Sequence, residues 1–228
     1  MVPNGRVDTE GDEAREVARI LLDGEAVSIN VANPFVYTSG IVSPIYCDLR
    51  LLTASPERRG RVVEAMVGLI SRSCNPSALD VVAGVATAGI SWAAWVSSAL
   101  NKPMAYVRDA PKGHGQGRQV EGGVVPGQTA IVIEDLTSLG GSAINAVEAL
   151  RGIGARADHC FSIFTYELPQ SRDGFQGAGV ELHSLCGVST LLEVATSSGQ
   201  VTGEEARAVQ EWLSEGPMAG SRAGSRNT

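Results

Sequence analysis

The sequence predicts an α/β fold in which a central parallel sheet is flanked by helices. Residues 130–133 form a short apolar run rich in β-branched side chains, which suits a strand buried on both faces. Residues 79–85 form a second such run, and each run leads through a turn of small residues into a stretch with helical apolar spacing. This alternation is typical of a parallel sheet, in which ligands bind beyond the carboxyl ends of the strands.

In the N-terminal half, element boundaries follow from capping residues and chain breakers. Ser55-Pro56-Glu57 supplies an N-cap hydroxyl, a proline at the first helical position and an acid in the first turn. An alternating stretch with Ser39-Gly40 in its middle favours a β-hairpin. The expected elements are a helix from Asp12 or Glu13, a strand at 27–30, the hairpin at 35–50, a helix at 55–73, a strand at 79–85, a helix at 90–100 and a strand at 103–107.

The C-terminal half continues the alternation. Apolar residues at helical spacing predict a helix from Ser142 or Ala143, and Thr202-Gly-Glu-Glu is a capping-box pattern. Further expected elements are a strand at 158–165, a short helix or loop at 171–178, a strand at 182–185, a helix at 191–195 capped by Ser189 or Thr190, and a helix at 204–213. Residues 12–213 are expected to form one domain between disordered ends, 1–11 and 214–228. The hairpin and the C-terminal segment would form a hood over the carboxyl edge of the sheet.

Composition narrows the class of protein. The chain has 228 residues, 43% hydrophobic and 19% charged, which is enough for one good-sized core. Its net charge of −7 argues against nucleic-acid binding. No apolar run approaches the roughly 20 residues that span a bilayer, and the N-terminus lacks a secretory signal. Four scattered cysteines indicate reduced thiols and a cytoplasmic protein.

The turn after the run 130–133 has the chemistry of an anion site. Residues 137–142 are rich in glycine and hydroxyl side chains and come directly before a helix, whose first N–H groups and dipole favour a phosphate. Glu134 and Asp135 cannot bind phosphate, but they can accept hydrogen bonds from sugar hydroxyls or face a metal held by the ligand. The combination predicts a phosphorylated ribose. Taken alone, the stretch also fits an ordinary glycine-rich βα connection.

Two further loops extend this hypothesis. Residues 86–89 form a second small-residue turn before a helix, which by itself is weak evidence for an anion site. Residues 108–123 are glycine-rich and carry Arg108, Lys112, His114 and Arg118. Such a loop favours a lid that closes over a polyphosphate. A solvated hairpin loop is the alternative.

A third candidate surface lies on the expected hairpin. Tyr46, Asp48 and Arg50 alternate along its second strand and would share one face, which is able to stack and hydrogen-bond a flat ring. An edge hairpin that only covers the core fits equally well. His159 and His183 fall within strand-like runs and are interpreted as structural.

Four motifs in order make the sequence resemble the type I phosphoribosyltransferases, and among them the orotate phosphoribosyltransferase family. These are residues 38–48 (TSGIVSPIYCD), 84–90 (GVATAGI), 106–115 with 119–122 (YVRDAPKGHG and QVEG) and 133–142 (IEDLTSLGGS). The resemblance covers about residues 21–213, nearly the whole expected domain.

The resemblance implies an activity. Members of this family transfer the 5-phosphoribosyl group of phosphoribosyl diphosphate (PRPP) to orotate, giving orotidine 5′-monophosphate and pyrophosphate in pyrimidine biosynthesis. It also implies Mg²⁺ bound through the pyrophosphate rather than by protein ligands, and a homodimer whose lids reach into the partner's site. By the same resemblance, Lys112 and His114 are catalytic, and Tyr46 and Ser138 contact orotate. The implied PRPP-binding residues are Thr87, Ala88, Gly89, Arg108, Lys112, His114, Glu134, Asp135, Leu136, Thr137, Ser138, Leu139, Gly140, Gly141 and Ser142.

The sequence departs from the family pattern at several positions. Many relatives have lysine at Asp109 and threonine at Leu139, and some have an arginine for the orotate carboxylate where this chain has Tyr166 and Glu167. Val42 and Leu49 also replace polar residues of the pattern. A lost charged hydrogen bond is worth about 1.5–3 kcal/mol. Two alternatives therefore stay open: a type I phosphoribosyltransferase for another base, and a non-catalytic regulator that binds PRPP or a nucleotide.

Overall fold

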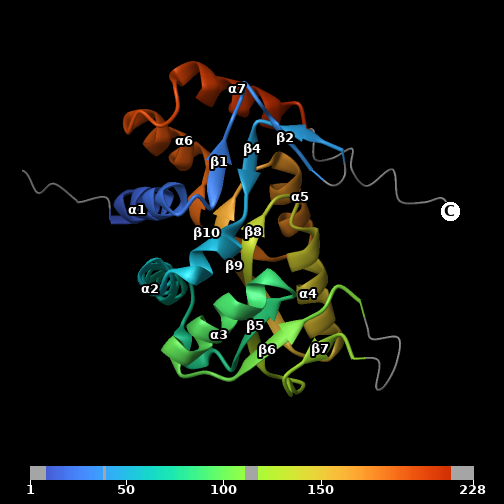
Figure 1. Cartoon of the computed structure of the whole chain (residues 1–228). Helices are drawn as coiled ribbons and strands as arrows, with labels where there is room; N and C mark the ends of the chain where they lie inside the picture. The colour runs from blue at the N-terminus through green and yellow to red at the C-terminus, as the bar shows by residue number, and fades with distance from the viewer. Residues whose placement is uncertain (1–8, 38–39, 111–117, 217–228) are drawn as a thin grey trace, which may run out of the picture.

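The computed structural model describes residues 9–37, 40–110 and 118–216 and contains a six-stranded sheet (Figure 1). The strand order is β10-β9-β8-β5-β6-β7, and only β7 is antiparallel to its neighbour. This confirms the predicted parallel sheet. The strands are β5 (Val81–Val85), β6 (Met104–Val107), β7 (Val120–Glu121), β8 (Thr129–Thr137), β9 (Arg156–Thr165) and β10 (Glu181–Gly187).

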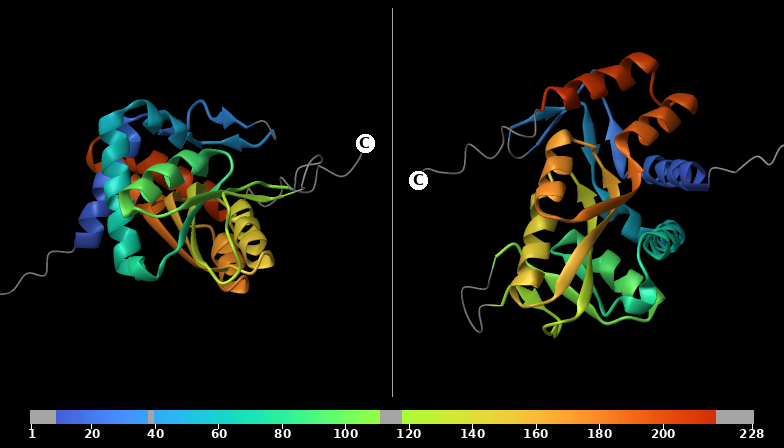
Figure 2. Two further views of the ribbon diagram at one scale, coloured as in Figure 1. Left: turned by 90° about the horizontal axis from the view of Figure 1, so that it is seen from below. Right: turned by 180° about the vertical axis from the view of Figure 1, so that it is seen from behind.

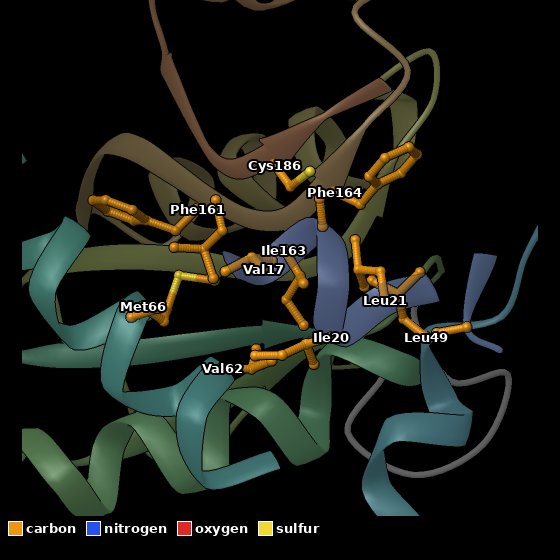
Figure 3. Packing of buried hydrophobic residues seen from close by; sticks show 14 of the residues in the cluster. Val17, Ile20, Leu21, Leu49, Val62, Met66, Phe161, Ile163, Phe164 and Cys186 are labelled. Atoms are coloured by element: carbon orange, nitrogen blue, oxygen red, sulfur yellow. The ribbon is translucent and has the colours of Figure 1, made fainter. Parts of the chain in front are cut away.

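Helices cover both faces of this sheet, as the views in Figure 2 show. Helices α1 (Thr9–Asp23), α2 (Pro56–Ser73) and α3 (Ala88–Leu100) pack on one face, and α4 (Gly141–Gly152) and α5 (Pro169–Gly177) pack on the other. Each face has its own apolar cluster. In the first cluster, Val62 and Met66 of α2 lie close to Phe161 and Ile163 of β9 (Figure 3).

The remaining elements gather at one end of the sheet and form the expected hood (Figure 1). They are β1 (Val27–Ile29), β2 (Phe35–Val36), β3 (Val42–Ser43), β4 (Ile45–Cys47), α6 (Val188–Ser197) and α7 (Gly203–Ser214). The indole N–H of Trp212 in α7 donates to the Val42 carbonyl over 2.9 Å. This bond connects the N-terminal part of the hood with its C-terminal part. Short 3-10 helices at Leu49–Ala54 and Pro76–Ala78 complete the described elements.

Local capping signals identified several helix starts. The Ser55 hydroxyl accepts a hydrogen bond from the Arg58 backbone N–H at the start of α2. At α7 the Thr202 hydroxyl accepts from the Glu205 N–H while the Glu205 carboxylate accepts from the Thr202 N–H, so the predicted capping box is confirmed. These motifs satisfy helix N–H groups with side chains close in sequence, which makes them readable without tertiary information.

Other boundaries were predicted wrongly. Helix α1 begins at Thr9, before the expected Asp12 or Glu13, so residues 9–11 are helical. Helix α6 is capped at Gly187 rather than at Ser189 or Thr190. The open choice at 171–178 resolves to the helix Pro169–Gly177.

The hairpin was wrong in its second strand. Strand β3 pairs with β2, but Pro44 follows and the chain turns away, so that β4 pairs with β1 instead. Asp48 then caps a 3-10 helix that contains Arg50. Tyr46, Asp48 and Arg50 therefore do not form one strand face.

All four cysteines are free thiols, as expected, and Cys160 and Cys186 are buried. Among the helices in the described residues, none has a stretch long and apolar enough to cross a membrane.

Two glycines test how tightly the sheet and its helices pack. A Cβ at Gly84 in β5 would lie 2.7 Å from the Gly89 carbonyl oxygen and 2.8 Å from the Ala93 Cβ, whereas one at Gly60 on the exposed side of α2 would meet nothing within 4 Å. We expect Gly84→Ala to lower the free energy of unfolding by about 1–3 kcal/mol. Gly60→Ala should raise it by about 0.5–1 kcal/mol because alanine favours a helix. Urea denaturation of both variants measures the two free energies of unfolding. Equal effects of the two substitutions would contradict the close packing around Gly84.

Candidate active site

The turn between β8 and α4 encloses a cavity of about 210 Å³, lined by Glu134 and residues 136–143. Gly140 adopts the left-handed conformation (φ 79°) before α4 starts at Gly141, and a Cβ there would lie 2.5 Å from the Phe175 ring. No side chain caps α4. Its first backbone N–H groups and its dipole are thus directed at the cavity, as the sequence predicted for an anion site.

One hydroxyl in this cavity has no partner among the described residues. Thr137 is 2% exposed and its Oγ1 makes no hydrogen bond, although its backbone carbonyl accepts from the Tyr166 N–H over 3.1 Å. A buried polar atom without a partner costs free energy. Thr137 Oγ1 is therefore available to a polar ligand that enters the loop.

The two acids lie inside β8 rather than after its end. The strand extends to Thr137, where it pairs with Thr165 of β9, and Glu134 is only 8% exposed. Burial, the negative charge of Asp135 and a hydrogen bond to it raise the pKa of Glu134 well above the usual carboxyl range. Burial also raises the pKa of Asp135, against the opposing effect of its hydrogen bond with Glu134. Glu134 therefore holds a proton that an exposed glutamate would lose.

The second predicted anion loop lies directly beside these acids. A Cβ at Gly89 would lie 2.5 Å from the Ile133 carbonyl oxygen and 3.5 Å from Glu134 Oε1, so the start of α3 contacts β8 at the acid pair. Thr87 is the N-cap residue of α3 and makes no side-chain capping bond, and the Ala86–Thr87 peptide bond is cis. The structure thus brings the 86–89 loop and the 137–142 loop to the same edge of the sheet.

Only the base of the predicted lid falls within the described residues, and Lys112 and His114 lie outside them. The Arg108 Nε lies 3.5 Å from a Glu121 carboxylate oxygen, and its Nη2 donates to the Tyr106 hydroxyl over 3.2 Å. The negative charge of Asp109 helps to raise the pKa of Glu134, although burial and Asp135 contribute more. The start of the loop therefore has an electrostatic effect on Glu134.

The hood places Tyr46 and Arg50 differently from the shared strand face that the sequence predicted. The Tyr46 ring packs against Phe35 and Tyr37, with centroids 5.5 and 6.1 Å away. Arg50 forms a two-bond ion pair with Asp48 (2.6 and 2.8 Å), and its charge acts to lower the pKa of Asp135. Arg50 is thus a cation near the acids, an arrangement that depends on the 3-10 helix and had no signal in the sequence.

Comparison with known proteins gives a consistent result. A family model described as "Phosphoribosyl transferase domain" matches residues 57–167. The chain is 43% identical to the orotate phosphoribosyltransferase of Coxiella burnetii over 88% of this chain and 95% of the relative, and 45% identical to that of Bacillus mycoides over 87% and 93%. The chain belongs to the orotate phosphoribosyltransferase family. The resemblance inferred from the four motifs is thereby confirmed.

A solved structure supports the fold of this phosphoribosyltransferase independently. The crystal structure of orotate phosphoribosyltransferase from Aeropyrum pernix matches with a TM-score of 0.68 and 30% identity, covering 78% of this chain and 96% of that chain. The expected fold class is confirmed.

One departure from the phosphoribosyltransferase pattern has a structural explanation. Glu167, which stands in the stretch where some relatives carry an arginine, adopts φ 55° and accepts a hydrogen bond from the Ser189 N–H over 2.8 Å. Its carboxylate thus stabilises the N-terminus of α6. The preceding Tyr166 is buried and donates to the Cys47 sulfur over 3.1 Å. Both residues join the sheet to the hood.

The raised pKa of Glu134 predicts a pH-dependent stability. Because the folded state keeps the Glu134 proton to higher pH than the unfolded state does, the free energy of unfolding should fall as pH rises above about 4.3, the ordinary glutamate value, towards the raised pKa. We expect Glu134→Gln to make this fall clearly smaller in urea denaturation at a series of pH values. Glu148→Gln, on the exposed side of α4, is the control and should keep the wild-type slope. Identical slopes in all three proteins would contradict the assignment.

Proposed function

We propose that this chain transfers the 5-phosphoribosyl group of PRPP to N1 of orotate, which gives orotidine 5′-monophosphate and pyrophosphate in pyrimidine biosynthesis. The observation that carries the proposal is the cavity of the 137–142 loop, which the buried Glu134 of β8 lines and beside which Asp135 follows in the strand. The identity to curated family members over nearly the whole chain supports the choice of orotate as the acceptor.

In this mechanism the backbone loops bind the two phosphate ends of PRPP. Residues 138–142 hold the 5′-phosphate through the N–H groups that begin α4, with Thr137 Oγ1 as an additional donor. Glu134 and Asp135 accept hydrogen bonds from the ribose hydroxyls. The residues proposed for the diphosphate are Thr87, Ala88, Gly89, Arg108, Lys112 and His114.

Displacement at the anomeric carbon passes through a transition state with oxocarbenium character. The ribose becomes more positive as the bond to the diphosphate breaks, and the leaving diphosphate becomes more negative. A nearby ionised Asp135 would stabilise the first change, and Lys112 and His114 on the closed lid would stabilise the second. Closure of the lid would also exclude water, which otherwise competes with orotate for the reactive carbon. Tyr46 and Ser138 are the residues proposed to contact the orotate ring.

The acid pair fits a role for Mg²⁺. Carboxylate oxygens beside a diphosphate are the ligand type that Mg²⁺ prefers, and Glu134 is buried at the edge where the two phosphate loops meet, with the half-buried Asp135 next to it in β8. When bound, Mg²⁺ supplies positive charge to the leaving diphosphate. The diphosphate would be its main ligand, with the two carboxylates facing the ion. We further propose a cytoplasmic homodimer in which each lid completes the partner's site.

The first test compares the two lysines of the chain, Lys102 and Lys112. The loss of orotate ultraviolet absorbance after addition of PRPP and Mg²⁺ measures turnover. We expect wild type and Lys102→Ala to turn over orotate, and Lys112→Ala to lose at least about 100-fold in kcat, because a charge that acts mainly in the transition state is missing. Unchanged turnover by Lys112→Ala would contradict its catalytic role.

The assay also tests the proposed substrate. Folded wild-type protein that consumes uracil or a purine but not orotate would overturn the choice of acceptor base. Binding of PRPP without any release of pyrophosphate would instead indicate a regulator on the same fold.

A further variant tests the departure at Asp109. Its negative charge raises the pKa of Glu134 and would oppose a diphosphate. We expect Asp109→Lys to lower the KM for PRPP about tenfold with little change in kcat, because it adds a cation where PRPP binds before the reaction. Glu64→Lys, which makes the same charge change on the exposed side of α2, should leave KM unchanged. An unchanged KM in Asp109→Lys would show that this side chain does not act on PRPP.

A further inference from the structure

Two histidines and a glutamate meet on one face of the sheet, away from the candidate active site. Glu181 of β10 pairs in register with His159 of β9, and His183 follows Glu181 by two residues, so all three side chains project from the same face. They lie near the start of both parallel strands, whereas the phosphate loop follows the carboxyl end of β8. The proposed transferase reaction does not use them.

The distances among their donor atoms are those of a metal site. His159 Nδ1 lies 3.1 Å from His183 Nε2, and Glu181 Oε2 lies 3.6 Å from each of these nitrogens. In a tetrahedral zinc site with bonds of about 2.1 Å, the ligand atoms are about 3.4 Å apart. The three atoms therefore form a triangle close to one face of such a tetrahedron, and one ion can contact all of them.

The two imidazole nitrogens are within hydrogen-bond distance of each other, but the glutamate does not take the position of a third hydrogen-bonded partner. A carboxylate that hydrogen-bonded one imidazole would approach that ring to about 2.7–3.2 Å. Glu181 Oε2 instead lies equally far from both rings and too far from either for a hydrogen bond. Two imidazole nitrogens and one carboxylate oxygen are a donor set typical of Zn²⁺ sites that keep an open position.

The surrounding structure holds the cluster in place and leaves it accessible. The Phe161 ring stacks on His183 with centroids 4.7 Å apart and an interplanar angle of 19°. The Glu181 side chain is 72% exposed, so solvent reaches the cluster. The nearby Arg72 of α2 forms an ion pair with Glu13 of α1, which offsets its charge.

We propose that His159, Glu181 and His183 bind one Zn²⁺-type divalent cation, with water in the fourth position, and that the ion joins the edge strand β10 to β9. A ligand that binds only the folded chain raises its stability. The site would thus stabilise the edge of the sheet that lacks a further strand beyond β10 among the described residues. This proposal stands apart from the transferase activity.

The test uses the full chain without a histidine tag and freed of metal by a chelator. We expect Zn²⁺ alone to bind with a stoichiometry of one in calorimetry and to raise the melting temperature by several degrees. Glu181→Gln, at an exposed position that tolerates the change, should weaken binding at least tenfold. Asp158→Asn removes an exposed carboxylate one residue from His159 that pairs with Arg151, and it should bind Zn²⁺ like the wild type. Equal binding by all three proteins, or no binding by the wild type, would overturn the proposal.

Spectroscopy identifies the ligands without a histidine variant. Co²⁺ substituted for Zn²⁺ should show tetrahedral d–d absorption without a thiolate charge-transfer band, and the nitrogen resonances of two of the three histidines should shift when Zn²⁺ is added. A thiolate band would assign the ion to a cysteine and contradict the site. Resonances that stay in place would do the same.

Discussion

The presence of two adjacent acids in the central strand, Glu134 buried and Asp135 half-buried, is the constraint on which the candidate site depends. Desolvation opposes the charge of Glu134 and Asp135, and the negative charge of Asp135 further opposes the ionisation of Glu134, whereas the hydrogen bond with Glu134 favours the ionised form of Asp135. Arg50 of the hood is a cation whose charge favours the ionised form of Asp135. Holding the two acids in β8 therefore destabilises the free protein, and a ligand that offers hydroxyl donors and a cation reduces this destabilisation.

Backbone geometry brings the rest of the site to this pair. The start of α3 packs so closely on β8 that Gly89 leaves no room for a side chain, and Gly140 is held against Phe175 in a left-handed conformation. Two helix N-termini thereby lie at one edge of the sheet, on either side of the acids. The hood adds Arg50 and closes the end of the sheet through the bond between Trp212 and Val42.

The sequence predicted those parts of the candidate site that depend on residues close to one another along the chain. A buried strand, two acids, a glycine turn and a helix start follow one another along 130–142, so this strand–turn–helix arrangement needed no tertiary information. The predicted hairpin forms between β2 and β3, but its second strand was extended too far because alternation predicts a strand and not its partner: β4 alternates correctly and pairs with β1. The end of β8 was placed too early for a similar reason, since hydrogen bonds to β9 continue the strand through polar residues up to Thr137. The proximity of His159 and His183 likewise depends on the register of two strands.

The residue at position 167 affects the stability of the neighbouring helix α6. A carboxylate at this position stabilises the start of α6, while a Cβ at Gly187 would lie 2.4 Å from it. An arginine there would remove this capping bond and bring a cation towards the positive end of the helix, which is unfavourable. The carboxylate at position 167 and the start of α6 therefore belong to one local arrangement.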